Sequence, residues 1–75
     1  MTLEEFVSRF AEEFDDTPEE QFTPDTKYRE LEEWGSLTAL SIISMIDDDM
    51  GVQITGADLR SVNTIAELYQ KVSEM

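Results

Sequence analysis

Residues 35–54 read GSLTALSIISMIDDDMGVQI and are the most informative part of the chain. Their apolar side chains recur at helical spacing and gather on one face of a helical wheel. Gly51 follows the last of them and is a typical helix stop, because glycine readily adopts the left-handed conformation that ends a helix. The pattern predicts a helix from about Ser36 to Met50. We expect its core face to consist of Ala39, Ile42, Ile43, Ile46 and Met50.

Leu37 falls near the centre of the polar face of this helix, where an apolar side chain is unexpected. An exposed apolar residue among polar ones is a candidate for recognition by a partner. Leu40 shares one flank of the helix with Asp47, and Met45 lies on the other flank. The polar residues on the face of Leu37 are Ser41, Ser44 and Asp48.

Three further helices are predicted from apolar stripes, each opened by a threonine with an acidic residue three positions later. This spacing is the capping box, in which each side chain bonds the backbone of the other residue. The expected helices run from Leu3 to Phe14, from Thr55 to about Ser61, and from Thr64 onward. Their agreement predicts one all-α domain over residues 1–75, folded as a bundle.

Residues 15–35 form a long connection that contains two prolines. A connection of this length in a small domain is usually functional, or carries short structure of its own. We expect its apolar side chains to anchor it to the core. These residues are Phe22, Tyr28, Leu31 and Trp34.

The composition excludes several kinds of chemistry. The chain has 75 residues, 18 acidic and 5 basic side chains, a net charge of −13, and neither cysteine nor histidine. Disulfides, catalysis by a thiolate or imidazole, and zinc sites built on Cys and His are therefore excluded. The negative charge disfavours nucleic acid and anionic membranes and favours a basic protein partner. With no membrane-spanning run and no signal-peptide pattern, we expect a cytoplasmic monomer.

The acidic residues do not predict a metal site or a catalytic site. If Gly51 took the sixth position of a calcium loop, Ile46 and Met50 would occupy two ligand positions, so we reject that motif. Adjacent glutamates such as Glu32 and Glu33 are expected to be exposed, and general acid–base catalysis usually needs a buried or held carboxyl. Fifteen of the 18 acidic residues precede Gly51, so the charge is concentrated on the first two helices and their connection.

Ser36 opens the second predicted helix, and a serine there is most often only an N-cap. Ala39 stands where the other three helix starts have an acidic residue, so this start lacks a capping box. The residues alone leave two interpretations open, a simple cap and a modification site.

From about Phe22 to Met75 the chain resembles the acyl carrier proteins. The resemblance implies an antiparallel bundle of three longer helices and one short helix. It also implies that Ser36 carries 4′-phosphopantetheine through a phosphodiester and that the arm holds acyl groups as thioesters. The carrier itself would not be an enzyme. The matching segments are Gly35-Ser36-Leu37, Leu40–Met50, Gly51–Ile54, Thr55–Ser61 and Asn63–Leu68.

The resemblance further implies a docking face on the second helix, with apolar contacts at Leu37 and Leu40 and acidic contacts at Asp47 and Asp48. The partners would be a phosphopantetheinyl transferase and acyl-transfer or condensing enzymes with basic patches. These enzymes would serve fatty-acid, polyketide or other specialised biosynthesis. The space for an acyl chain would be lined by Ala39, Ile43 and Ile46, although ordinary core packing explains these residues equally well.

Three positions depart from the family pattern. Gly35 replaces the usual aspartate before the serine, Ser41 replaces an acidic residue, and Ser44 replaces an apolar one. We infer a carrier for a specialised pathway. Two alternatives remain open at this point: an unmodified acidic interaction module with the carrier fold, and a peptidyl or aminoacyl carrier.

Overall fold

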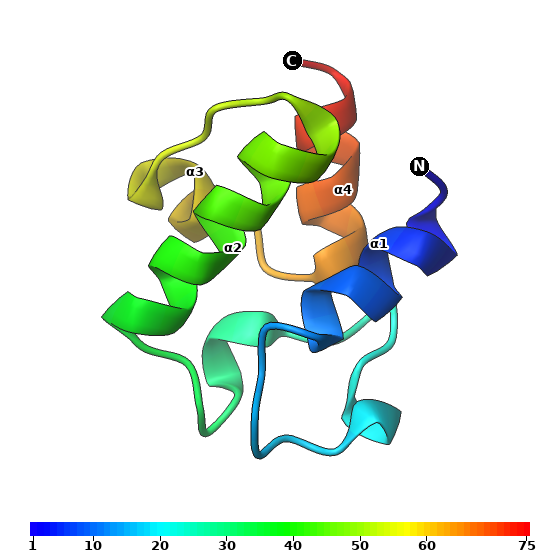
Figure 1. The fold of residues 1–75 in the computed structure, drawn as a ribbon, viewed down its shortest axis with the longest axis vertical. Helices are drawn as coiled ribbons and strands as arrows, with labels where there is room; N and C mark the ends of the chain where they lie inside the picture. Colours follow the sequence, from blue (N-terminus) through cyan, green and yellow to red (C-terminus); the bar gives the residue numbers. More distant parts are fainter.

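A computed structural model describes residues 1–75 and contains four α-helices and no β-sheet (Figure 1). The helix α1 contacts α4, and α2 contacts α3. The structure confirms the predicted all-α bundle. No helix has the length and apolar composition needed to cross a membrane. The bounds are Leu3–Ala11 for α1, Ser36–Met50 for α2, Gly56–Ser61 for α3 and Ile65–Ser73 for α4.

Three helices begin with capping boxes, as the sequence predicts. The side chains of Thr2, Thr55 and Thr64 each accept a hydrogen bond from the backbone three residues on. Gly51 ends α2 in the left-handed conformation with φ of 68°, and its N–H donates to the carbonyl of Asp47. These local signals therefore fix the C-terminal end of α2 and the starts of the other three helices, as predicted.

The end of α1 is a correction, because the helix stops at Ala11 and not at Phe14. The chain continues in tight turns, in which Glu13 N–H donates to Phe10 O and Phe14 N–H donates to Ala11 O. Bonds between residues three apart tighten the last turn of a helix. Phe14 still reaches the core through this turn and is buried.

The long connection carries two short 3₁₀ turns, Glu19–Gln21 and Tyr28–Glu30, and its apolar residues pack on the core as predicted. The buried hydroxyl of Tyr28 donates to the carbonyl of Leu59 at 2.5 Å. The half-buried ring of Trp34 meets the ring of Tyr28 edge-on, with 5.1 Å between the ring centroids. The connection is therefore fixed to α3 on one side and leads directly into α2 on the other.

The buried face of α2 differs from the prediction. Met45, predicted on a flank, is only 2% exposed, whereas Ala39 and Ile43 are half-buried at the edge of the core. Met45 thus points into the core, and Met50, predicted on the core face, is also only half-buried. The core itself contains fourteen buried side chains, all apolar except for the Tyr28 hydroxyl.

Candidate functional site

Ser36 is the first residue of α2, and its side chain is exposed. Gly35 occupies the N-cap position, so the interpretation of Ser36 as the cap is wrong. No side chain caps this helix, and its first backbone bond runs from Ala39 N–H to Gly35 O at 2.9 Å. The N–H groups at the start of α2 are therefore free of side-chain partners, and the hydroxyl of Ser36 forms no hydrogen bond within the chain.

Ser36 differs from every other serine in its position. The other five lie inside a helix or are its last residue, and the hydroxyl of Ser61 donates a hydrogen bond to the carbonyl of Asp58. Only Ser36 combines an unpaired hydroxyl with the start of a helix, where free N–H groups and the helix dipole favour a negative group. The other serines are Ser8, Ser41, Ser44, Ser61 and Ser73.

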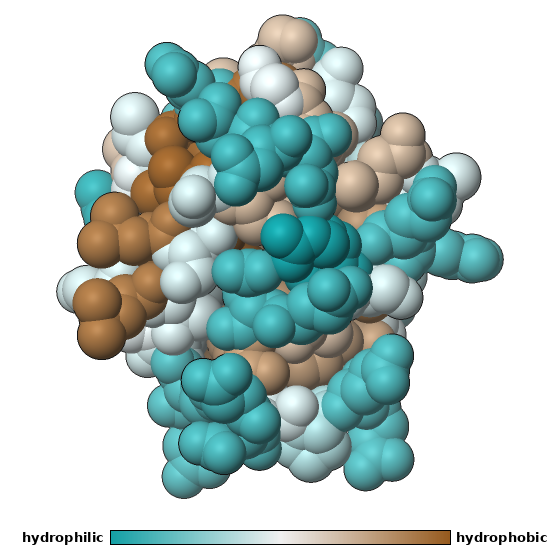
Figure 2. Space-filling view, viewed as in Figure 1, coloured by the Kyte–Doolittle hydropathy of each residue, from teal (hydrophilic) through white to brown (hydrophobic).

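Leu37 and Leu40 follow Ser36 and project from α2 into solvent. Leu37 is 82% exposed and Leu40 is 61% exposed, and the other large apolar side chains with high exposure are those of Met1 and Met75 at the chain ends. Figure 2 shows hydrophobic atoms gathered on the side of the molecule where the first half of α2 lies. The exposure predicted for Leu37 from the helical wheel is confirmed.

The three aspartates at the end of α2 divide into two groups. The carboxylate of Asp49 lies 2.7 Å from Nε of Arg9 on α1. Asp47 and Asp48 are exposed and form no ion pair within the chain. The helix has no basic residue in its last turn to balance them. The carboxylates of Asp47 and Asp48 are thus available to an external cation.

An open groove of about 550 Å³ runs between α2 and the extended segment 53–55 that precedes α3. Of the three residues predicted to line a space for an acyl chain, Ile43 lines this groove. Ile46 is fully buried in the core, and Ala39 packs at its edge. The sequence did not predict the second side of the groove, because no residue pattern shows that the chain lies alongside α2 after Gly51. The lining residues are Leu40, Ile43, Ser44, Asp47, Gln53, Ile54 and Thr55.

Comparison with known proteins identifies the family. A family model described as a phosphopantetheine attachment site matches residues 4–72. The chain belongs to this family. No curated protein and no solved structure matches the chain. This phosphopantetheine-attachment domain is therefore a carrier to which 4′-phosphopantetheine becomes covalently attached.

The residues of this domain fit the attached group. A serine hydroxyl is the atom needed for a phosphate ester, and Ser36 offers one that is exposed and unpaired at the start of α2. The phosphate would lie beside helix N–H groups that no side chain occupies. No side chain caps this helix start, and a Cβ atom built on the neighbouring Gly35 would meet nothing within 4 Å.

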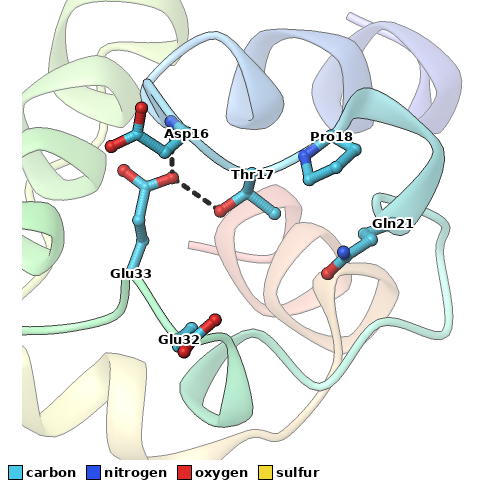
Figure 3. A pocket seen from close by; sticks show the side chains of 6 residues that line it. All are labelled: Asp16, Thr17, Pro18, Gln21, Glu32 and Glu33. Carbon is cyan, nitrogen blue, oxygen red and sulfur yellow. Dashed lines mark hydrogen bonds between the residues drawn. The ribbon is translucent and has the colours of Figure 1, made fainter.

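Glu33 is the residue near this start that sequence reasoning missed, because it was expected to be exposed beside Glu32. It is half-buried, and its carboxylate faces the segment that follows α1 (Figure 3). It accepts hydrogen bonds from Thr17 Oγ1 at 2.6 Å, from Asp16 N–H at 2.8 Å and from Asp15 N–H at 3.2 Å. The bond from the Thr17 hydroxyl, followed by those from the backbone, holds the pKa of Glu33 below its usual value.

Proposed function

We propose that Ser36 is the attachment residue and that the chain carries acyl intermediates as thioesters on the phosphopantetheine arm. The observation that carries the assignment is the unpaired, exposed hydroxyl of Ser36 at the one helix start that lacks a cap. Membership of the family supports the carrier role, and the acidic chain is suited to presenting a cargo to other proteins. The bond-making chemistry would belong to those partners.

The donor of the arm would be a compound in which pantetheine phosphate is part of a phosphoanhydride, such as coenzyme A. Oγ of Ser36 forms a bond to phosphorus, the anhydride P–O bond breaks, and the nucleotide part leaves with its phosphate. The hydroxyl proton passes to a base of the transferase or to solvent. The new phosphodiester keeps one negative charge, which the free N–H groups of α2 and its dipole stabilise.

We further propose that partner enzymes dock on α2 beside Ser36. Leu37 and Leu40 supply apolar surface, and Asp47 and Asp48 supply charge for lysine or arginine side chains on the partner. The expected partners are a phosphopantetheinyl transferase and acyl-transfer or condensing enzymes. Complementary charges mainly raise the association rate and select the partner, while buried apolar side chains contribute most of the affinity.

The groove beside Ile43 is the proposed resting place of the cargo. Four of its lining side chains are polar, namely those of Ser44, Asp47, Gln53 and Thr55. A long alkyl chain would leave these groups without water and without hydrogen-bond partners, which is unfavourable. This lining favours a specialised pathway with polar intermediates, such as polyketide or aminoacyl groups, over the saturated chains of fatty-acid synthesis.

The attachment can be tested by intact mass spectrometry after incubation with coenzyme A and a promiscuous phosphopantetheinyl transferase. We expect one added phosphopantetheine on the wild-type chain and none on Ser36→Ala. Ser41→Ala and Ser44→Ala are matched controls from the same helix and should be modified as fully as the wild type. Absence of modification by several transferases would overturn the proposal.

A second candidate is an acidic interaction module that keeps the fold without the arm, and Gly35 in place of aspartate favours it. The backbone at Gly35 is extended, with φ of −173°, so its conformation does not require glycine. The departure therefore changes the chemistry beside Ser36 and not the path of the chain. Under this alternative Ser36→Ala retains biological activity in a complementation assay, whereas under the carrier proposal that activity is lost.

A further inference from the structure

Glu33 lies three residues before Ser36 and connects two segments that are distant in sequence. Its carboxylate binds residues that follow α1, sixteen to eighteen positions earlier in the chain. Its own carbonyl accepts a hydrogen bond at 2.8 Å from the hydroxyl of Thr38 in the first turn of α2. One residue thus joins the beginning of the long connection to the beginning of the helix that carries Ser36.

The segment between Glu33 and Ser36 has few other fixed points. Trp34 is held by its ring contact with Tyr28 and by a bond from its N–H to Leu31 O at 3.0 Å. Gly35 has no side chain, and nothing lies within 4 Å of the place where its Cβ would be. Without the contacts of the Glu33 carboxylate, the chain before Ser36 would lose its hydrogen bonds to residues 15–17.

We propose that Glu33 is a positioning residue for the attachment of phosphopantetheine, which it promotes by fixing the place of Ser36 relative to the body of the domain. The inference rests on the proposed function of Ser36. A transferase must bring a phosphorus atom within reach of Oγ of Ser36, and small misplacements of reacting atoms are costly, with about 1 Å reducing a rate by roughly a hundredfold. Holding the hydroxyl of Ser36 in one place would reduce this loss of rate.

Glu32 provides a matched control, because it carries the same charge at the neighbouring position. Both residues line a small open pocket of about 280 Å³, but only Glu33 reaches the residues across it (Figure 3). Glu32 is exposed and forms no hydrogen bond or ion pair. Removing either carboxylate changes the net charge equally, so a difference between the two variants is not an effect of net charge.

The test measures kcat and KM for arm transfer to wild type, Glu33→Ala, Glu33→Gln and Glu32→Ala. We expect kcat to fall about tenfold or more in Glu33→Ala, with KM nearly unchanged because the docking residues on α2 are intact. Glu33→Gln should lie between Glu33→Ala and the wild type, because its amide oxygen can still accept the bonds from Asp16 and Thr17. Glu32→Ala should match the wild type.

The outcomes separate this inference from the proposal on which it rests. If the wild type is not modified at Ser36, the proposed function fails. If the wild type is modified and Glu33→Ala reacts as fast as Glu32→Ala, the role of Glu33 is overturned while the proposed function stands. Circular dichroism confirms folding at the assay temperature, and if Glu33→Ala is unfolded, Thr17→Val decides, since it removes the shortest bond and should lower kcat in the same direction.

Discussion

Arg9 on α1 and Asp49 on α2 form an ion pair, with 2.7 Å between Nε and the carboxylate oxygen. Arg9 also contacts Glu13 one turn later at 2.5 Å, and these two partners hold the pKa of Arg9 above its usual value, Glu13 more than Asp49. Asp49 therefore links α2 to α1 within the bundle. Its neighbours Asp47 and Asp48 have no such partner and remain available for docking.

Asp49→Asn should lower the free energy of unfolding by about 0.2–1 kcal/mol, the usual range for a pair that is partly exposed. Asp48→Asn makes the same change of charge at a position without a partner. It should leave stability unchanged or slightly higher, because a helix C-terminus disfavours negative charge. Urea denaturation followed by circular dichroism measures both. Equal effects of the two substitutions would show that the pair with Arg9 contributes nothing.

Asp48→Lys should slow association with a basic partner and flatten the dependence of the association rate on salt. Stopped-flow measurements with the transferase at several salt concentrations check this expectation. Glu20→Lys is the control, since it reverses the same charge in the 3₁₀ turn Glu19–Gln21, which lies on the side of the molecule away from the start of α2 (Figure 1). A rate equally reduced by both variants would indicate an effect of net charge and not of the α2 surface.

Leu37→Ala should weaken transferase binding without destabilising the chain. The side chain is 82% exposed, so its removal leaves no cavity. If the partner buries it fully, the loss of binding free energy is about 1.5–3 kcal/mol. Calorimetric titration gives the affinity, and thermal unfolding gives the stability. Met45→Ala provides the contrast, because truncating a buried methionine costs about 2–5 kcal/mol of stability. Unchanged affinity in Leu37→Ala would remove this residue from the proposed docking face.

Tyr28 should make stability depend on alkaline pH. Burial raises its pKa from 10.0 to about 12, because the charged form is disfavoured inside the protein. The fold therefore favours the neutral phenol, and this contribution is complete below pH 10 and is lost as the pH rises from 10 to 12. Denaturant unfolding at several pH values should show this loss in the wild type.

Tyr28→Phe removes both the titrating group and the bond to Leu59 O. At neutral pH it should be less stable by about 1–3 kcal/mol, because a buried carbonyl loses its partner. Between pH 10 and pH 12 its stability should fall less steeply than that of the wild type. A pH dependence identical to that of the wild type would contradict the assignment of the alkaline transition to this hydroxyl.

The parts of the fold that the sequence predicts well are those fixed by nearby residues. The stop at Gly51 and the boxes at Thr2, Thr55 and Thr64 depend on bonds within four positions, and all of them are present. The exposure of Leu37 also follows from helical periodicity alone, whereas periodicity placed Leu40 only on a flank of the helix. The end of α1 was missed because Phe14 continues the apolar stripe after the backbone has left the helix.

The features that were missed depend on residues far apart in the chain. Met45 is buried because of how α2 rotates against its neighbours, which the periodicity of one helix does not determine. The groove needs residues 53–55 to return alongside α2. Glu33 accepts hydrogen bonds from residues sixteen or more positions away, so it could not be distinguished from Glu32 in the sequence. The roles of Ser36, Asp47 and Asp48 remain predictions.

The contact between Trp34 and Tyr28 gives the chain a spectroscopic property. Trp34 is the single tryptophan, it is half-buried, and it lies two positions from Ser36. Its fluorescence therefore comes from one place, and any event that moves the backbone before α2 or covers the indole alters the emission. Unfolding, arm attachment and enzyme binding can all be followed through this native fluorophore, with no dye or tag introduced near the surface under study.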